Sequence, residues 1–480
     1  MPGAAATAQR FGITRGEYEG RLDVPFYLPK HRELEVRMHA CGFPVHRVGS
    51  REISSQVVDG PFGSDLKVNE YVPEGVPLLR VSNCRTGQIQ VDDELVFIGE
   101  AKHEELIRSE VLPGDVLLTK AGAILGYSAV FPKELKKGNI TSHLASIRPV
   151  EGVESRYLSE FLTSPIGIQQ IYRWGNKSTR PELNTDEVRA IEVVLPPPKK
   201  QKELVAAMDA ARAERRAKLA KADALLAGLD DFLLATLGLT PPPKDNRKVF
   251  AATLGAVRGR ADADFHSPRF RTIREGIEKG KFAAQPLAVL CSRFESGFAA
   301  GKQDQAFDYD CGVPHLRPLN LSAEGELSLE NTKFVPKSAV GPNDYCEKNE
   351  VLFNNTNSAE MVGKSDVFEL SEPCACSNHM TRLRTVPGVN PFYLAAVFNM
   401  FRRFGYFSLL ATKFNNQAGI NLDTLKPLRL PAPPPAVQET IAAEARRRRE
   451  EARRLRAEAE AGWQAAKRWF EEQLLGPAQP

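Results

Sequence analysis

The sequence predicts a mixed α/β protein of the α+β class, in which two similar globular domains are joined by two long helices that pair as an antiparallel coiled coil. Two observations lead to this fold. The first is an internal repeat, because Val76 to Asn83 matches Val313 to Asn320 at a separation of 237 residues. The second is a pair of long charged runs without proline, Gln201 to Leu237 and Gln438 to Leu475, each of which follows a proline cluster. At about 1.5 Å per residue, each run would form a helix on the order of 55 Å long.

The repeat extends along nearly the whole length of each half. Its upstream part matches Arg21 to Pro29 with Arg260 to Pro268 at a separation of 239 residues. The other matched pairs, separated by 236 or 237 residues, are His143 and His379, Arg148 and Arg384, Tyr157 and Tyr393, Leu158 and Leu394, Asn184 and Asn421, and Gln201 and Gln438. A register this constant indicates a duplication, so each half is expected to fold as a globular domain followed by a helix.

Within each globular domain, short β-rich runs alternate with turn residues, and a helix is expected at 156–172 and again at 391–406. A final β-like run, 191–195 in the first half and 425–430 in the second, precedes each proline cluster, and proline ends the sheet there. The expected boundaries are a tail at 1–20, a domain at 21–196, a helix at 197–238, a linker at 239–259, a domain at 260–432 and a helix at 433–476.

Apolar residues recur along both long runs at alternating spacings of three and four, which is the pattern by which two helices pack along one seam. An antiparallel pair would place the two domains at opposite ends of the helices and give the chain a pseudo-twofold axis. The seam residues that are also candidates for contact with a partner protein are Leu219, Leu226 and Leu233 in the first run and Leu455, Trp463 and Phe470 in the second.

The composition bounds the class of protein. A chain of 480 residues is too long for one ordinary core and suggests two to four domains. A net charge of +4 is only mildly basic, so the total charge does not by itself indicate a nucleic-acid partner. Seven cysteines at irregular spacing favour reduced thiols over a disulfide framework. The start has no apolar signal-peptide core and no window is apolar enough to span a membrane, so we expect a cytoplasmic protein.

Two motifs of nucleotide and methyl-transfer chemistry are incomplete. Gly363 to Ser365 looks like the end of a phosphate-binding loop, but Ser358 stands where that loop needs a glycine. Asn390 to Phe392 lacks the second proline of the adenine-methyltransferase tetrapeptide. The sequence therefore predicts no catalytic residue and no cofactor bound by this chain.

The spacing of the candidate ligands also argues against a metal site. Cys374, Cys376 and His379 offer three soft ligands, but Cys-x-Cys is a poor chelate spacing and the first half has no matching cysteines. Buried core thiols are the better interpretation, and no metal is expected. His143 and His379 are interpreted as structural residues, because no nucleophile or base recurs beside them in both halves.

Several motifs in a fixed order carry a resemblance to a known family. In the first half they are Gly60 to Ser64, Val76 to Arg80, Pro113 to Leu118, Leu183-Asn184, Leu195 to Pro197 and Gln201. The second half repeats the order with Val313 to Asn320, Asn349 to Leu352, Ile420-Asn421 and Gln438. Together, over about residues 20 to 475, they resemble the specificity subunit of type I restriction-modification systems. The second half departs from the pattern, since Asn349-Glu350 replaces Gly114-Asp115 and only Ser296 to Phe298 could correspond to Gly60 to Ser64.

The resemblance implies a non-catalytic DNA-binding protein with two target-recognition domains, each of which reads one half of a split sequence in double-stranded DNA. It also implies that the two long helices dock methyltransferase subunits, of which two are expected. Those partners would methylate adenine with S-adenosylmethionine. Where a restriction subunit is present, it would use ATP and Mg to cut unmodified DNA, which is a phage defence.

Exposed loops rich in Arg, Lys, Asn, Gln, Ser and Thr are the expected DNA contacts, because these side chains bind phosphates and base edges. Two such loops occur in each half. The candidates are Thr119, Lys120, Lys177, Ser178, Thr179 and Arg180 in the first half, and Asn354, Asn355, Asn357, Lys413, Asn415, Asn416 and Gln417 in the second. The alternative is that Asn and Thr clusters only form turns. Arg80 and Arg317 could equally be partners in structural ion pairs.

The densest charge is the basic run Arg446 to Arg456, which is compatible with a solvated helix face, a phosphate contact or an acidic partner surface. Two other functions remain open. A fused nuclease or methyltransferase with an unrecognised active site would cut or methylate DNA unaided. A coiled-coil scaffold that binds only protein would not retain duplex DNA even with partners present.

Overall fold

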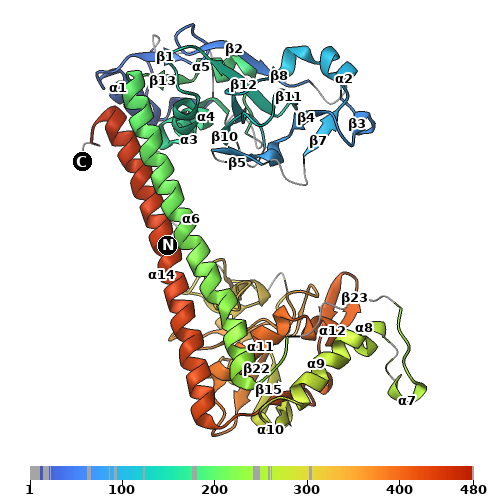
Figure 1. The fold of residues 1–480 in the computed structure, drawn as a ribbon. Coiled ribbons are helices and arrows are strands. Elements are labelled where there is room, and N and C mark those ends of the chain that lie inside the picture. Colours follow the sequence, from blue (N-terminus) through green and yellow to red (C-terminus); the bar gives the residue numbers. More distant parts are fainter. Residues whose placement is uncertain are drawn as a thin grey trace. The chain divides into compact units, whose positions relative to one another are not determined.

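The structure is a computed structural model of the 480-residue chain. It describes residues 11–14, 21, 23–61, 66–85, 87–90, 95–122, 125–175, 181–241, 249–257, 260, 262–301, 305–306 and 308–477. These residues form two compact units, which we call the first unit (11–218 and 457–477) and the second unit (219–456). The long helices α6 (Pro198–Leu237) and α14 (Pro435–Leu475) each contribute one part to each unit (Figure 1).

Two sheets form the globular part of the first unit. The order of the four-stranded sheet is β10 (Ser128–Val130), β9 (Val116–Thr119), β12 (Leu144–Pro149) and β2 (Ser54–Asp59). The order of the five-stranded sheet is β3 (Tyr71–Val72), β7 (Val96–Ile98), β4 (Val76–Leu79), β11 (Gly138–Ile140) and β8 (Glu110–Val111). Strands β4 and β11 are parallel, whereas the other pairs in these two sheets are antiparallel.

Helices and two short pairings complete the first unit. The helices are α1 (Pro29–His39), α2 (Glu100–Glu105), α3 (Ser155–Thr163), α4 (Pro165–Gly175) and α5 (Thr185–Ala190). The two-stranded pairings are β1 (Val45–Arg47) with β13 (Glu192–Val194) and β5 (Cys84–Arg85) with β6 (Gln88–Ile89). The single helix expected at 156–172 is therefore two helices. The break lies at Ser164, whose extended backbone (ψ 164°) is what the proline that follows it imposes.

The second unit repeats this plan with shorter sheets. The order of its four-stranded sheet is β15 (Cys291–Ser296), β22 (Met380–Thr385), β18 (Val351–Asn354) and β20 (Ser365–Val367). A second sheet has the order β17 (Lys333–Pro336), β16 (Gly312–Leu316) and β21 (Ala375–Cys376), and a third has β19 (Thr356–Asn357), β24 (Gln417–Gly419) and β23 (Thr412–Phe414). Strands β16 and β21 are parallel, as β4 and β11 are in the first unit.

The helices of the second unit are α7 (Leu254–Val257), α8 (Ala263–His266), α9 (Pro268–Glu278), α10 (Leu287–Leu290), α11 (Pro391–Arg403), α12 (Tyr406–Leu410) and α13 (Leu422–Leu425). The helix expected at 391–406 ends at Arg403, because Gly405 takes a left-handed conformation (φ +78°) that ends a helix. The β-like run expected at 425–430 is also shorter. Leu425 ends α13, and only Arg429–Pro431 (β25) pairs with β14 (Ala284–Pro286).

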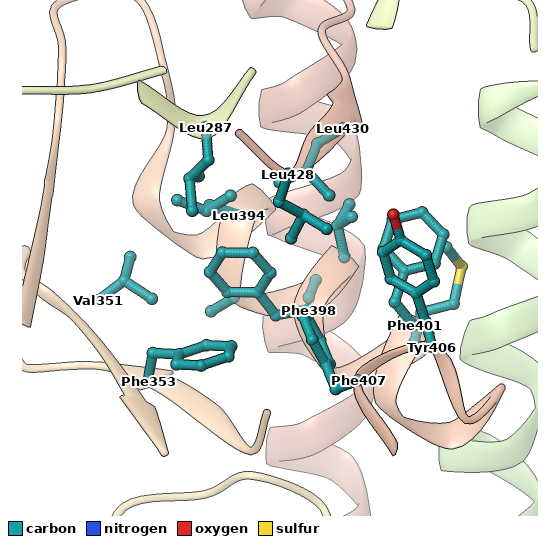
Figure 2. Close-up of a cluster of buried hydrophobic side chains, with 14 of the residues drawn as sticks. Leu287, Val351, Phe353, Leu394, Phe398, Phe401, Tyr406, Phe407, Leu428 and Leu430 are labelled. Atoms are coloured by element: carbon teal, nitrogen blue, oxygen red, sulfur yellow. The ribbon is translucent and has the colours of Figure 1, made fainter. Parts of the chain in front are cut away.

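A phenylalanine cluster forms the centre of the second unit's core. Figure 2 shows Phe353 of β18 beside Phe398 of α11 and Phe407 of α12. Ring centroids lie 5.3 Å apart between Phe353 and Phe398 and 5.2 Å apart between Phe353 and Phe407, both edge to face. Burial of each ring contributes about 1.5–3 kcal/mol. Leu233 of α6 belongs to the same core, so part of a long helix is built into the globular body.

The two long helices run antiparallel inside each unit, as the sequence predicts. In the second unit, Asp223 of α6 pairs with Arg456 of α14 at 2.9 Å, while Leu225 accepts from Arg448 further back along α14. In the first unit, the ion pair between Arg215 and Glu460 (3.4 Å) and the hydrogen bond between Lys200 and Gln473 (2.6 Å) follow the same direction. Among the described residues, no helix has the length and apolarity needed to cross a membrane.

Candidate nucleic-acid interface

The glutamine at the start of each long helix fixes that helix to its globular body. In the first unit, Gln201 donates to the carbonyl of Pro196 at 2.8 Å and accepts from the backbone of Glu154 at 2.8 Å. In the second unit, Gln438 donates to the carbonyl of Pro433 at 2.8 Å and accepts from the backbone of Asn390 at 2.8 Å. The repeated glutamines of the sequence are therefore equivalent structural clamps.

The repeated tyrosines and asparagines are equivalent as well. The hydroxyl of Tyr157 donates to the carbonyl of Val194, and that of Tyr393 donates to the carbonyl of Pro431. Burial raises the pKa of both phenols, so they remain neutral donors. Asn184 caps α5 and Asn421 caps α13, each by accepting from a backbone N–H three residues on.

Gly60 has a structural counterpart in the second unit, which the sequence left doubtful. A Cβ atom at Gly60 would lie 2.2 Å from the carbonyl oxygen of Ile140, and one at Gly297 would lie 2.0 Å from that of Cys376. Only glycine fits such an approach to backbone. The neighbouring motif residues Phe62 to Ser64 lie outside the described residues.

The second departure from the repeat is also conservative in structure. Gly114 and Asn349 both have positive φ, +96° and +68°, so the asparagine adopts the turn that the glycine adopts. The acids that follow, Asp115 and Glu350, each accept from the backbone N–H three residues earlier, at 2.8 and 2.9 Å. Both turns therefore serve the same purpose.

Four of the predicted DNA contacts are buried and do not form a surface. They are Thr119, Lys120, Asn354 and Asn355. The backbones of Lys120 and Asn355 occupy the same place, because each donates to the carbonyl of the repeated histidine, at 2.9 and 3.0 Å. Polar composition predicted that these side chains are exposed, but they are buried beneath the loops.

The buried polar side chains have specific partners. Lys120 Nζ donates to Asp59 at 3.2 Å, and although burial raises the pKa of that carboxyl, Lys120 and Arg108 hold it below its usual value. In the second unit, the amide of Asn355 donates to Thr381 at 2.9 Å. These contacts join segments that are distant in sequence, which explains why the sequence could not show them.

The other predicted contacts of the second unit meet in one small sheet. The exposed residues Lys413, Asn415, Asn416 and Gln417 belong to the β23–β24 hairpin, whose turn has positive φ at Asn415 and Asn416 (+41° and +62°). Asn357 of β19 pairs with β24 in register with Ala418. The two predicted loops of this unit are thus adjacent. In the first unit, Lys177, Ser178, Thr179 and Arg180 lie outside the described residues.

Asn357 and Gln417 line a polar hollow of about 580 Å³ in the second unit. Its lining also includes Arg317, Lys333 and His379. The hollow therefore combines amide side chains with cationic ones, the set that binds base edges and phosphates. Sequence reasoning missed Lys333. Sequence reasoning treated Arg317 as a possible ion-pair partner. Within the described residues, the guanidinium of Arg317 donates one hydrogen bond, to the carbonyl of Asn331 at 3.4 Å.

The lining of the hollow includes two buried polar side chains, His315 and Ser377, each 4% exposed. His315 Nε2 and Ser377 Oγ have no hydrogen-bond partner among the described residues. Burial lowers the pKa of His315, against the opposing effect of the carbonyls of Cys376 and Phe298, so the imidazole is mainly neutral near pH 7. These two side chains are thus polar without being charged.

The repeated histidines differ from the structural interpretation in one respect. The side chains of His143 and His379 are exposed, and only their backbone carbonyls take part in the conserved hydrogen bonds of the two units. Cys374 and Cys376 are buried free thiols, as expected. No group of His, Cys, Asp or Glu side chains suited to a metal ion occurs within the described part of the chain.

The residues predicted to face a partner protein take part in packing within the units. Leu226 and Leu455 pack in the helix seam with Ala222 and Ala452. The remaining residues are placed as follows: Leu233 in the core of the second unit, Phe470 in that of the first with Trp463 packed against it, and Leu219 half-buried on α6. Apolar spacing marked the intramolecular seam, because the same pattern serves helix pairing and core packing.

The basic run of α14 is largely neutralised within the second unit. Its ion pairs are Arg447 and Arg448 with Glu444, Arg449 with Asp366, Arg453 with Glu326, Arg454 with Glu451, and Arg456 with Asp223. The guanidinium of Arg446 also lies 4.5 Å from the ring centre of Phe392. Most of the run is therefore an exposed helix face with pairs inside α14, which is one of the three meanings considered from the sequence, and Arg449 is its partly buried link to the globular body.

Comparisons with known proteins agree with the sequence resemblance. No protein-family model matches the chain. A protein of Methanocaldococcus jannaschii, provisionally named the type I restriction enzyme MjaX specificity subunit, is 33% identical over 96 residues, which span 19% of this chain and 22% of that protein.

Among solved structures, a chain from a type I restriction-modification system studied for its complex assembly aligns over 90% of this chain and 96% of its own length, with a TM-score of 0.54 and 15% identity. The type I S subunit of M. genitalium aligns over 92% and 97%, with a TM-score of 0.44 and 10% identity. The chain shares the fold of a type I restriction-modification component, and it resembles the specificity subunits of these systems.

Proposed function

We propose that this chain is the DNA-binding specificity subunit of a type I restriction-modification complex. In this proposal each unit reads one half of a bipartite target in double-stranded DNA. The chain carries no chemistry of its own and directs two adenine methyltransferase subunits and, where one is present, a restriction subunit, in the cytoplasm. S-adenosylmethionine would be bound by the methyltransferase, and ATP and Mg by the restriction subunit.

One observation carries the proposal: the two units have the same hydrogen-bonded skeleton but different polar side chains on it. The glutamine clamps, the tyrosine bonds and the close glycines are equivalent at every pair described above. By contrast, strand β4 has Leu78 where β16 has His315, and the turn that follows has Ser82 where the second unit has Leu319. Two heads of one shape with different surfaces suit the reading of two different short sequences.

The chemistry of the hollow supports DNA as the ligand. Arg and Lys side chains contact phosphates and guanine, and Asn and Gln side chains contact adenine. Arg317 and Lys333 supply the first kind, and Asn357 and Gln417 the second. Because such contacts release counterions from DNA, affinity should fall steeply with salt concentration.

The two incomplete enzyme motifs have structural uses in this fold. Lys364, the lysine of the phosphate-loop-like triplet, is buried and donates to the carbonyls of Pro318 and Leu321. Burial, assisted by Arg402, lowers its pKa to about 8. Asn390 caps α11 by accepting from backbone N–H groups. These roles favour the non-catalytic proposal over a fused enzyme.

The test is to co-express the full chain with a candidate methyltransferase subunit from the same genome, in a host without adenine methylation, and to map methylated adenines. The expected result is one split motif that depends on both proteins. Purified chain that methylates or cuts DNA unaided would establish the fused-enzyme alternative. Failure to retain duplex DNA, even with the methyltransferase bound, would favour a protein-binding scaffold.

A further inference from the structure

Unsatisfied polar atoms gather at the hollow of the second unit. Besides His315 Nε2 and Ser377 Oγ, Nε of Arg317 is buried and has no partner among the described residues, which also holds for Nε of arginines outside the hollow such as Arg269 and Arg402. Burying a polar group without a hydrogen bond costs about 1–3 kcal/mol, so native structures avoid it or complete it with a ligand or an ordered water. The two neutral groups, His315 Nε2 and Ser377 Oγ, distinguish this hollow and indicate that something binds there.

The first unit shows what a satisfied arrangement looks like. There, the buried polar side chain between the equivalent strands is Asn139 of β11, opposite Leu78 of β4. It pairs with Nδ1 of His103 at 2.6 Å and donates to the carbonyl of Leu106 at 3.0 Å and to Ser109 Oγ at 3.1 Å. In the second unit Ala375 lies opposite His315 instead, and Nε2 of this histidine has no partner among the described residues. The histidine is therefore not required by the strand pairing, since leucine occupies its position in the first unit.

Arg317 is held in place by its own turn. Its backbone N–H donates to Asn320 Oδ1 at 2.9 Å, and the amide of Asn320 donates to Ser328 at 3.0 Å and to Thr332 at 2.7 Å. Asn320 is buried, so this network fixes the turn that carries the arginine. A guanidinium presented from a fixed turn can make directional hydrogen bonds without a large loss of side-chain freedom.

The chemistry of the open groups selects the ligand. Arg317 Nε–H can only donate, and the hydroxyl of Ser377 and the imidazole of His315 can donate as well. The matching ligand presents several acceptors close together. In the major groove, guanine does so with N7 and O6, and arginine is its commonest partner. A phosphate is the alternative acceptor for the cationic side chains of the lining, and the experiment below separates it from a base contact.

We propose that this hollow reads a guanine in the half-site of the second unit, with Arg317 bonding its N7 and O6 edge and with His315 and Ser377 completing the contact directly or through an ordered water. This inference rests on the proposed function. It makes Arg317 the residue that specifies one base position, and His315 and Ser377 the residues that restrict what the hollow accepts.

The experiment maps methylated adenines for the full chain co-expressed with its methyltransferase, as wild type, Arg317→Ala and His315→Leu. Arg317→Ala should relax one guanine position of one half-site, with discrimination falling about tenfold or more, and leave the other half-site unchanged. His315→Leu should relax the same position while the melting temperature stays the same or rises, because a buried unsatisfied group is removed.

Two control variants make the result specific. Arg80→Ala changes the equivalent arginine of the first unit. It should leave unchanged the half-site that Arg317→Ala relaxes. Lys279→Ala removes an exposed cation just after α9 that does not line the hollow, and it should change neither half-site.

Each contrary outcome overturns the inference in its own way. An unchanged motif with Arg317→Ala would show that the hollow reads no base. Uniform loss of methylation across all sequences would identify a phosphate contact instead. A lower melting temperature with an unchanged motif for His315→Leu would make that histidine a structural residue. Wild-type protein that directs no split motif would overturn the proposed function, and this inference with it. The variant results described above would overturn only this inference and would leave the proposed function standing.

Discussion

The two units fasten their long helices with an arginine at the same position but with acids from different elements. Arg212 of α6 and Arg449 of α14 each follow the clamping glutamine by 11 residues. Arg212 donates to both oxygens of Glu160 on helix α3, at 2.7 and 2.9 Å. Arg449 donates instead to Asp366 on strand β20, at 3.0 Å. The position of the cation is common to both units, whereas the element that supplies its partner is not.

This difference shows what the repeat preserves. Contacts between a globular body and its long helices keep their geometry even when the partner changes, because they fix where the body sits on the helix. Side chains at the hollow of the second unit have no such constraint, and there the units differ in kind, with His315 and Leu319 in place of Leu78 and Ser82. The preserved contacts predict stability, and the varied positions around Arg317, which the first unit matches with Arg80, predict specificity.

The largest expected effect comes from breaking the arginine pair of the first unit. Arg212→Ala leaves Glu160, whose side chain is 3% exposed, buried without its cation. Such a loss typically costs about 3–5 kcal/mol, so the free energy of unfolding measured by denaturant titration should fall by that amount. Arg216→Ala, an exposed arginine of the same helix, is the control. The double variant Arg212→Ala/Glu160→Ala should regain part of the loss, and a fall below about 1 kcal/mol for Arg212→Ala would mean that the pair does not anchor the helix.

A second prediction tests whether Gly60 and Gly297 are equivalent. In both Gly60→Ala and Gly297→Ala the new methyl group would press on a backbone carbonyl, which cannot rotate away as a side chain can. Each variant should lose about 1–3 kcal/mol or more of unfolding free energy, by a similar amount in the two units. Gly462→Ala on α14, where nothing lies within 4 Å, should instead gain up to about 1 kcal/mol. Tolerance of alanine at only one of the two sites would show that the repeat is inexact there.

A third prediction concerns a buried histidine that only the first unit has. The pKa of His31 is lowered from 6.5 to about 4, chiefly by burial and secondly by the nearby positive charge of Arg173. Between pH 6.5 and pH 4 the unfolded chain therefore binds a proton on this histidine, whereas the folded chain does not. The stability that the neutral ring contributes is lost as the pH falls through this range. The second unit has Phe270 at this position. His31→Phe should therefore make the melting temperature fall less between pH 7 and pH 5, and an equal fall in wild type and variant would contradict the lowered pKa.

The sequence predicts the frame of this fold well and the burial of its polar candidate residues poorly. Gln201 and Gln438 mark the helix starts, because a clamp that recurs in both halves leaves a visible repeat. Lys120 and Asn355 were expected at the surface because they are polar, but their partners Asp59 and Thr381 are distant in sequence and bury them. His315 lies in an ordinary strand pattern, and only the packed structure shows that its Nε2 has no partner among the described residues.

The smallest effect on stability is expected at Leu319, and it sharpens the comparison most. This leucine is 81% exposed on the turn between Arg317 and Asn320, at the lining of the hollow. Leu319→Ser installs the first unit's residue, and because the side chain is already in water, the unfolding free energy should change by less than about 0.5 kcal/mol. In the proposed complex, the apolar Leu319 side chain beside Arg317 can contact a thymine methyl group. Discrimination at the position next to the guanine should therefore fall a few-fold in the mapped motif. Ser82→Leu in the first unit is the reciprocal variant and should act on the other half-site. A loss of stability with an unchanged motif would show that Leu319 belongs to the preserved frame and that the boundary between frame and reading surface lies elsewhere.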